Sequence, residues 1–293
     1  MEITISIINY NYGQYLKQAI ESALNQTTDV DYEVLVIDDG STDNSDEIIA
    51  SYQSHPKFRS SKTENRGFAA ALTRALTEAN GYYVFFMDAD DYFELDKINV
   101  ILPLLKMKTN YYVADCPKPF DNKGGFYSSY FPPGCTSTVA VNREKALVLC
   151  PVENELWFHT LKKLGFGIFL ETSYTNYRIH GSNMTNRTIA GKWQNYLYKM
   201  TFNLYNQLIK ESDNIADALS IKSSKVIKTA KFLKAQGYYN KTEMHLELGS
   251  RSKAFKAFLK MVYYNLITIH RIKFFDIKML IRVILVWPSQ KKG

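Results

Sequence analysis

Two short, mostly apolar segments with an amphipathic segment between them open the chain. ITISIIN (3–9) and EVLVIDD (33–39) are rich in β-branched residues, which is typical of parallel strands covered on both faces. Between them, YLKQAIESALNQ (15–26) repeats apolar residues at helical spacing. A strand, a helix and a strand in this order predict a βαβ unit, which restricts the fold to the α/β class.

The same alternation continues to the end of a third apolar segment. STDNSDEIIASY (41–52) predicts a second helix that Ser41 or Asp43 can cap, and AAALTRALTEAN (69–80) predicts a third helix. YYVFFMDADD (82–91) then predicts another buried strand. We therefore predict a Rossmann-like, mostly parallel sheet with helices on both faces, in which ligands bind beyond the carboxyl ends of the strands.

The pattern is coarser after this point. Residues 110–150 contain Pro and Gly clusters, and we expect substrate-facing loops there, over a partial second sheet. Residues 150–165 are expected to be helical and 168–180 extended. From about residue 190 the pattern predicts helix to the end of the chain.

Charge divides the chain into two parts. Residues 1–186 hold 16 Lys and Arg against 23 Asp and Glu, a net charge of −7, whereas residues 187–293 hold 20 against 6, a net charge of +14. A basic segment suits nucleic acid, anionic lipid or an acidic macromolecule. We predict two domains, 1–190 and a basic, amphipathic helical region over 191–293.

The basic region carries an apolar stripe at helical spacing. The stripe consists of Phe255, Phe258, Leu259, Val262, Leu266 and Ile269. Its basic neighbours are Lys253, Lys256, Lys260, Arg271, Lys273 and Lys278. Such a helix can lie in a membrane interface, and the mixture favours an anionic lipid surface over nucleic acid. An ordinary helix that packs on the rest of the protein is the alternative.

Cysteine usage and hydropathy indicate a compartment. Cys116, Cys135 and Cys150 are odd in number and lack the close spacing of a metal site, which suits a reducing cytosol. The beginning of the chain has no basic leader, and MLIRVILVW (279–287) is far shorter than the roughly 20 residues that span a bilayer. We expect a cytoplasmic protein that is peripheral on the cytoplasmic face of the plasma membrane.

Three carboxylates crowd the end of the third apolar segment. Asp88, Asp90 and Asp91 follow a run that has the character of a buried strand. Like charges this close repel one another, so a divalent cation is the counter-charge that best explains them. A solvated turn after the strand is the alternative interpretation.

Four motifs in one order resemble the glycosyltransferase family 2 enzymes of GT-A fold. They are SIINYNYGQYLKQAIESALNQ (6–26), VLVIDDGSTDNS (34–45), FFMDADDYF (85–93) and YRIHGSNMT (177–185). The resemblance covers about residues 1–187. It implies a nucleotide-sugar donor, a divalent metal and a single inverting displacement at the anomeric carbon.

The resemblance also implies roles for individual residues. Asp88 and Asp90 match the family's D-x-D motif, which holds Mn²⁺ or Mg²⁺ on the donor diphosphate, and Asp88 can also contact the ribose. The late His of the family is His180, a further metal or diphosphate ligand, although a lone His is often structural. Arg178 would hold phosphate or pair with a surface carboxylate.

The nucleotide is assigned to the ends of the first two strands. By resemblance, Asn9 and Tyr10 belong to the nucleotide site, with the Tyr10 ring stacked on the base, while Asp39 accepts a hydrogen bond from the base edge. Arg66 would approach the same ligand. Core packing of Tyr10, a turn or cap at Asp39 and an exposed loop at Arg66 are the alternatives.

The general base is the point where the sequence departs from the family. The family places an Asp in an E-D pair at the start of a helix, whereas here the pair reads Val152-Glu153. Glu153 therefore stands where the base is expected, and Glu155 is a close competitor. Carboxylates that merely favour a helix N-terminus are the alternative.

Together these features predict a metal-dependent inverting glycosyltransferase. It would move a sugar from a nucleotide-diphosphate donor, expected to be a UDP-sugar, to a hydroxyl of a glycan or lipid-linked acceptor in cell-surface polysaccharide synthesis. The alternative is a catalytically weak or inactive sugar-binding or nucleotide-binding scaffold, because the base position is atypical. A nucleotidyltransferase or a D-x-D-x-T phosphatase is disfavoured by NYNYGQY after the first strand and by Tyr92, respectively.

Overall fold

The computed structural model describes residues 1–127, 133–181, 189–269, 279–280 and 282–283. The chain divides into two compact units, Met1–His180 and Gly181–Gly293. The sequence prediction put the boundary between residues 190 and 191. Each unit is described by itself below.

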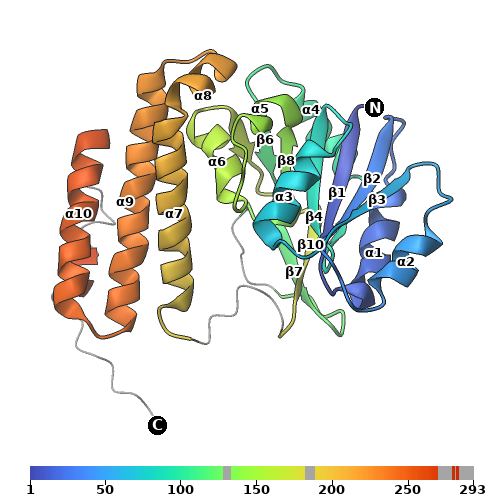
Figure 1. Ribbon diagram of the computed structural model, residues 1–293, viewed down its shortest axis with the longest axis horizontal. Helices are drawn as coiled ribbons and strands as arrows, with labels where there is room; N and C mark the ends of the chain where they lie inside the picture. Colours follow the sequence, from blue (N-terminus) through green and yellow to red (C-terminus); the bar gives the residue numbers. More distant parts are fainter. Residues whose placement is uncertain (128–132, 182–188, 270–278, 281, 284–293) are drawn as a thin grey trace, which may run out of the picture. The chain divides into compact units, whose positions relative to one another are not determined.

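The first unit is built on a seven-stranded sheet (Figure 1). In spatial order its strands are β3 (Phe58–Lys62), β2 (Tyr32–Asp38), β1 (Ile3–Asn9), β4 (Tyr83–Asp88), β8 (Val139–Asn142), β6 (Tyr112–Ala114) and β9 (Gly167–Phe169). Within the described sheet, β8 alone runs antiparallel to its neighbours β4 and β6, and every other pairing is parallel. The predicted mostly parallel sheet is confirmed.

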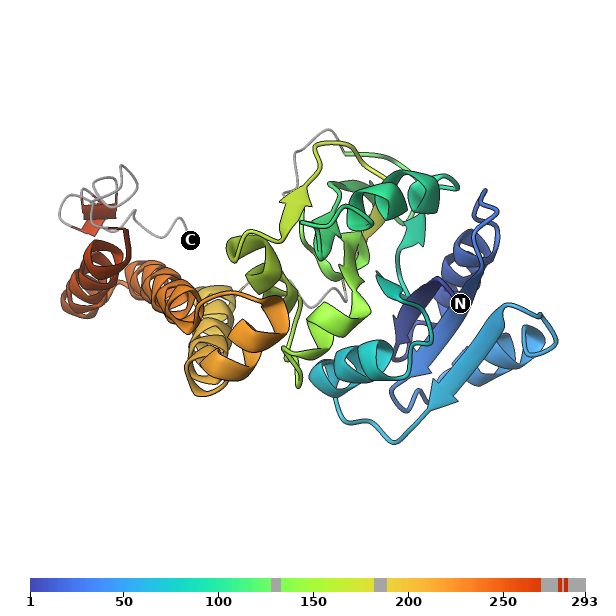
Figure 2. The same ribbon diagram turned by 90° about the horizontal axis from the view of Figure 1, so that it is seen from above.

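Helices cover both faces of this sheet, as Figures 1 and 2 show. On one face lie α1 (Gly13–Leu24), α2 (Ser45–Ser51) and α4 (Lys97–Leu105), and on the other lie α3 (Phe68–Thr77), α5 (Arg143–Leu147) and α6 (Leu156–Lys163). Alternation along the strands explains this arrangement. Ile5 points into the core shared with α1 and α4, whereas the Ser6 hydroxyl donates to the Ala75 carbonyl of α3 at 3.0 Å. On that second face, the Phe86 ring of β4 stacks on Phe158 of α6 with centroids 4.8 Å apart.

A second, three-stranded sheet lies beside the main one. Its strands are β5 (Tyr92–Phe93), β10 (Thr175–Ile179) and β7 (Pro117–Asp121), with β10 antiparallel to β5 and parallel to β7. This sheet connects the segment just after β4 with two segments that lie later in the chain.

Three local predictions need correction. The helix expected over 150–165 begins only at Leu156. Asn154 Oδ1 accepts a hydrogen bond from the Leu156 N–H at 2.9 Å, at the point where the preceding loop ends. The stretch expected to be extended over 168–180 is two strands, β9 and β10, separated by a turn. The edge strand β3 was not predicted, because its sequence FRSSK is mostly polar and only Phe58 is buried.

The second unit is helical where it is described. It contains α7 (Lys192–Lys210), α8 (Ser212–Leu219), α9 (Ser223–Glu247) and α10 (Arg251–Ile269). A small core of its own includes Tyr238 of α9 with Phe258 and Met261 of α10. The predicted helix beyond Ile269 and the basic residues Arg271, Lys273 and Lys278 lie outside the described residues. None of the described helices combines the length and apolarity needed to cross a bilayer.

The topology marks one place for a ligand. The connection from β1 leads to β2 on one side, whereas the chain returns through β3 to β4 on the other side of β1. The strand order therefore reverses between β1 and β4, and ligands of open α/β sheets bind at the carboxyl ends of strands at such a reversal. Ile8 stands opposite Asp88 in the parallel register, so β1 and β4 end at the same level.

Candidate active site

The acidic residues at the end of β4 converge in space. Asp88, Asp90 and Asp91 each offer a carboxylate oxygen, and these atoms all lie within 4.8 Å of one another. Asp90 and Asp91 are buried. Burial and the mutual repulsion of the carboxylates raise the pKa of Asp88 and Asp91 well above the usual range. Three hard oxygen donors in this setting fit Mg²⁺ or Mn²⁺, whose charge would remove the repulsion.

His180 lies against this cluster. Its Nε2 is 2.9 Å from Asp90 Oδ2, so the structure brings together the three residues predicted as metal ligands, Asp88, Asp90 and His180. The imidazole ring also packs against the rings of Tyr12 and Tyr15, with centroids 5.5 and 5.2 Å away. These contacts fix the ring beside Asp90.

Ser137 and Arg178 hold the acidic cluster from two other segments. The Ser137 hydroxyl donates to Asp91 Oδ2 at 2.5 Å and accepts from the Asp88 backbone N–H at 2.9 Å. The Arg178 backbone N–H donates to Asp91 Oδ1 at 2.8 Å, and its Nε donates to the Asp90 carbonyl at the same distance. Arg178 is only 7% exposed and its guanidinium lies over the Tyr15 ring, 4.5 Å from the centroid. Through these two hydrogen bonds Arg178 holds Asp90 and Asp91 in place.

The buried Lys97 holds Ser137, one of the residues that contact the acidic cluster. Lys97 of α4 is fully buried and donates from Nζ to Asp115 Oδ1 at 3.0 Å, to Thr175 Oγ1 at 2.6 Å and to the Ser137 carbonyl at 2.8 Å. Satisfying all the donors of the ammonium makes burial of this charge tolerable. The arrangement ties α4, β10 and the turn that carries Ser137 into one rigid support.

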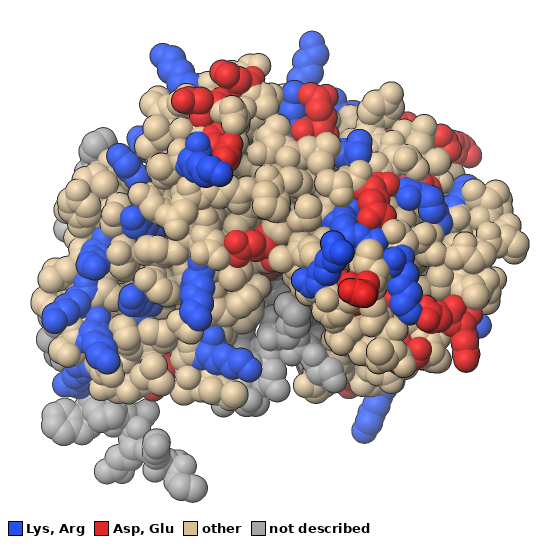
Figure 3. Space-filling model, in the orientation of Figure 1, with Lys and Arg blue, Asp and Glu red and all other residues tan. Residues whose placement is uncertain are grey.

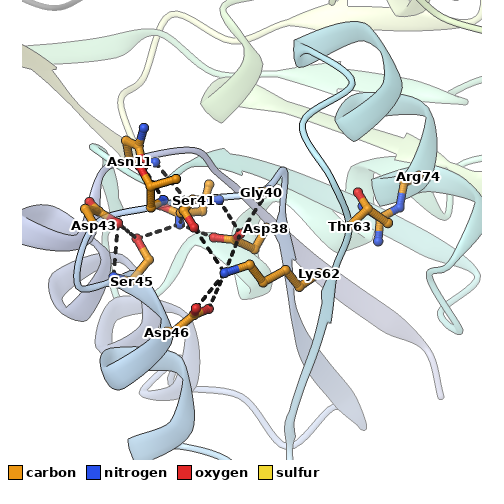
Figure 4. A network of polar contacts seen from close by, with 12 residues as sticks. Asn11, Asp38, Gly40, Ser41, Asp43, Ser45, Asp46, Lys62, Thr63 and Arg74 are labelled. Carbon is orange, nitrogen blue, oxygen red and sulfur yellow. Dashed lines mark hydrogen bonds and ion pairs between the residues drawn. The ribbon is translucent and has the colours of Figure 1, made fainter.

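The ends of β1 and β2 are locked together by the network shown in Figure 4. Asn11 has a positive φ of 58°, and its Oδ1 accepts from the Thr42 N–H at 2.8 Å. Asp43 Oδ2 accepts from the Gly13 N–H at 2.8 Å, which satisfies one of the donors at the start of α1. Lys62 closes the network from β3 with bonds to Asp46 and to the Ser41 carbonyl. The motifs NYNYG and DDGSTDNS therefore fold as one unit.

Within this network, Tyr10 is exposed whereas Asn9 is buried. Tyr10 is 46% exposed at the end of β1, where its ring can meet a ligand. Asn9 has no exposed surface, and its Nδ2 faces Asp38 Oδ2 at 2.6 Å and two serine hydroxyls. Asn9 thus holds the loop that carries Asp38 and Ser41, and its predicted contact with the nucleotide stays a prediction.

Asp39 and Arg66 lie together. The buried Asp39 carboxylate accepts the backbone N–H groups of Arg66 at 3.0 Å and Gly67 at 2.8 Å, while the Arg66 side chain is exposed. Asp39 thus fixes the loop that leads into α3, which was the alternative weighed for it. Each carboxylate oxygen has a further lone pair, so a base-edge contact stays a prediction.

The two candidate bases stand in the loop before α6. Glu155 is close enough to Asp88 for its charge to raise the pKa of that carboxyl, and burial raises the pKa of Glu155 itself. Glu153 and Glu155 are both half-buried in this loop. A carboxyl with a raised pKa next to the acidic cluster has the chemistry of a general base for work near neutral pH. The interaction of its charge with Asp88 makes Glu155 our candidate for the base.

Sequence reasoning missed two residues at the site. Tyr12 packs against His180 with ring centroids 5.5 Å apart, and burial together with the charges of Asp90 and Asp88 raises the pKa of its phenol well above the usual value. It stands two residues after Tyr10 in the same motif, and that repetition of an aromatic residue was the available signal. Ser137 gave no signal, because only the tertiary fold brings it from the irregular region to Asp91.

Known proteins are similar to this chain in sequence over part of its length and in fold over most of it. The sequence model of the family described as "Glycosyl transferase family 2" matches residues 4–164. A chondroitin synthase of Pasteurella multocida is 42% identical over 109 residues, which are 36% of this chain and 11% of that protein. An uncharacterised glycosyltransferase of Nostoc is 38% identical over 108 residues, 36% of this chain and 33% of its own length. The matches thus cover a minor part of these relatives.

A solved structure extends the likeness to most of the chain. The crystal structure of S. aureus TarS 1-349 in complex with UDP-GlcNAc superposes with a TM-score of 0.60, at 16% identity, over 90% of this chain and 91% of that one. At this identity the likeness establishes the fold, which is the GT-A fold predicted from the motifs. With the family match covering more than half of the sequence, the chain belongs to glycosyl transferase family 2.

Proposed function

We propose that this protein is a metal-dependent inverting glycosyltransferase that uses a nucleotide-diphosphate sugar, most simply a UDP-sugar. The observation that carries the proposal is the convergence of Asp88, Asp90 and Asp91 at the point where the strand order reverses. Membership of the family supports sugar transfer as the reaction. UDP is favoured because the TarS structure with the same fold was solved with UDP-GlcNAc.

In this proposal each residue has a defined task. Asp88 and Asp90, with His180 beside them, would hold Mn²⁺ or Mg²⁺, which when bound supplies the Lewis acid that stabilises charge on the departing diphosphate. Tyr10 offers its ring to the base, and Asp39 offers its remaining lone pairs to the base edge. Arg66 presents its exposed guanidinium to the nucleotide side of the site.

The acceptor side needs a base. Glu155 takes the proton from the acceptor hydroxyl as that oxygen attacks the anomeric carbon from the face opposite the leaving group, which inverts the configuration. Glu153 is the alternative base, since it stands where the family resemblance expects one. Sugar chains are the acceptors we propose, free or lipid-linked, because a chondroitin synthase and a hyaluronan synthase are among the relatives.

The place of the reaction is also a proposal. Cys116, Cys135 and Cys150 are not joined in disulfides, which supports a reducing compartment such as the cytoplasm. A position on the inner face of the plasma membrane would bring a lipid-linked acceptor within reach.

Metal-dependent donor binding tests the proposal. We expect UDP to bind much more tightly in Mn²⁺ than in EDTA, and Asp90→Asn to remove most of this difference in isothermal titration calorimetry. Asp29→Asn is the matched control, since Asp29 is an exposed aspartate in the loop before β2. Equal UDP affinity with and without metal in the wild-type protein would rule the proposed site out.

Turnover separates the enzyme from the scaffold alternative. A panel of UDP-, GDP- and dTDP-sugars is incubated with the protein in Mn²⁺, and release of the nucleotide is followed. Metal-dependent binding without any release would identify a nucleotide-binding scaffold.

A further inference from the structure

One face of α10 exposes an unusual number of large apolar side chains. Phe255, Leu259, Tyr263 and Leu266 are 43%, 50%, 58% and 41% exposed, respectively. Their spacing of three to four residues puts them in one line along the helix. We call these four residues the apolar face of α10.

The described core of the helical unit does not include this apolar face. α10 is already anchored through its opposite side, where Ala254, Phe258 and Met261 are buried in the core that Tyr238 of α9 completes. The predicted stripe therefore divides in the structure, since Phe258 belongs to that core and the apolar face remains for another contact. An isolated exposed leucine is ordinary, but four neighbouring large side chains on one helix indicate a binding surface.

Positive charge accompanies the apolar face. Lys253, Lys256 and Lys260 are exposed and follow one another at spacings of three and four residues, so they form a second line beside the first. The sequence of α10, Arg251–Ile269, contains no Asp or Glu. Figure 3 shows Lys and Arg side chains gathered over the helices of this unit with few acidic ones among them.

We infer that the apolar face of α10 and its line of lysines dock on an anionic phospholipid surface. Nucleic acid or an acidic polysaccharide would satisfy the lysines and leave the apolar face in water. A lipid interface satisfies both, because acyl chains accept Phe255, Leu259 and Leu266 while anionic headgroups meet the lysines. Tyr263 suits the boundary, since a tyrosine ring prefers apolar surroundings and its hydroxyl prefers water. This inference goes beyond the proposed glycosyl transfer and does not depend on it.

Sedimentation of the full-length protein with vesicles tests the inference. We expect little binding to pure phosphatidylcholine and strong binding when about a third of the lipid is phosphatidylglycerol. High salt should weaken the binding only in part, because salt screens the lysines but not apolar burial. Equal sedimentation with neutral and anionic vesicles would overturn the inference.

Paired variants locate the surface. Lys253→Gln/Lys256→Gln should lower vesicle affinity roughly tenfold or more at low salt, since each basic residue near an anionic surface contributes a fewfold factor. Lys108→Gln/Lys123→Gln, which removes two exposed lysines from the first unit, is the control of equal charge. An equal loss in both double variants would show that only net charge matters and would overturn the assignment to α10.

A second pair of variants tests the apolar contribution to vesicle binding. Leu259→Glu should remove most of the salt-resistant binding, whereas Leu95→Glu should not, although Leu95 is equally exposed at 53% against 50%. Tyr263→Trp provides a check that leaves the surface intact: brominated lipid in anionic vesicles should quench its fluorescence more than that of the wild-type protein with its three tryptophans, and Tyr82→Trp should show no such increase. If Leu259→Glu instead changes the sedimentation coefficient of the protein alone, the face binds a second copy and the lipid assignment is wrong.

Discussion

At the scale of single residues, the site depends on carboxylates whose charges act on one another. The charge of Glu155, in the loop before α6, acts on Asp88, although the two residues are 67 positions apart in the sequence. Glu153, two residues earlier, matches the position where the family has its Asp. These two facts point to different bases, and we propose the residue whose charge acts on Asp88.

Substitution of the two glutamates should distinguish them. We expect Glu155→Gln to lower turnover by about 10²-fold or more with UDP binding nearly unchanged, because general base catalysis contributes roughly 10² to 10⁴. Glu153→Gln should have a much smaller effect. Steady-state kinetics and calorimetry on both variants measure this, and the reverse pattern would return the role to Glu153.

His159 gives the stability a predictable dependence on pH. Its burial beneath the site lowers its pKa to about 4 from an ordinary value of 6.5, and Nε2 lies 2.8 Å from the Gly134 carbonyl. As the pH falls, His159 is therefore protonated in the unfolded chain at a higher pH than in the folded protein. The folded state loses stability as pH falls from about 6.5 towards 4. This one group should cost about 2 kcal/mol between pH 7 and pH 5.

The matched variant for this prediction is His159→Gln. Its amide can still donate to the Gly134 carbonyl but does not titrate, so the corresponding part of the pH dependence should disappear. Urea unfolding at pH 7 and pH 5 provides the measurement. An unchanged pH dependence in the variant would mean that other groups cause it.

At the scale of elements, the contact between β1 and the turn before β4 decides where the site forms. Gly81 lies against the backbone of β1, and a Cβ there would stand 2.5 Å from the Ile3 carbonyl carbon and from the Thr4 nitrogen. The Gly81 N–H also donates to the Thr4 hydroxyl at 2.9 Å. Glycine is needed for this close approach, which keeps β1 and β4 in the register that brings Asp88 level with Ile8.

Gly81→Ala should consequently destabilise the protein. The added methyl group meets backbone atoms that cannot turn away, so we expect a loss of about 1–3 kcal/mol in unfolding free energy, the usual cost of overpacking. Gly181→Ala is the control, because among the described residues, its chain neighbours apart, no atom lies within 4 Å of its added Cβ. Chemical denaturation of the two variants makes the comparison, and equal stability would show that β1 can shift to accept the methyl group.

The sequence was most informative for the elements with strong periodicity. β1, α1, β2 and β4 were predictable because buried parallel strands are nearly continuous apolar runs and α1 repeats its apolar residues at helical spacing. β6 and β8 were not, since strands of three and four residues between prolines and glycines carry no period. The acidic cluster was predictable because three carboxylates stand within four residues of the sequence. Ser137 and Lys97 could not be linked to it, because only the folding of those short strands and their neighbours brings these residues together.

At the scale of the whole molecule, each unit has its own core. One core of the first unit takes its buried residues from Ile3 to Ala140, and a small core of the helical unit takes its buried residues from Tyr238 to Val283. Charge follows the same division, with a net charge of −7 over residues 1–186 and +14 over residues 187–293. Donor binding and surface attachment are therefore assigned to different parts of the chain.

A truncated chain of residues 1–190 should separate the two activities. It keeps the acidic cluster, Tyr10, Asp39 and His180, so we expect UDP to bind in Mn²⁺ with an affinity within a few fold of the full-length protein. It lacks α10, so its sedimentation with anionic vesicles should fall to the level seen with neutral lipid. Circular dichroism and cooperative unfolding establish that the truncated chain is folded before either comparison is made. Vesicle binding that survives truncation would move the lipid surface to the first unit, and loss of UDP binding in a folded truncated chain would mean that the helical unit completes the donor site.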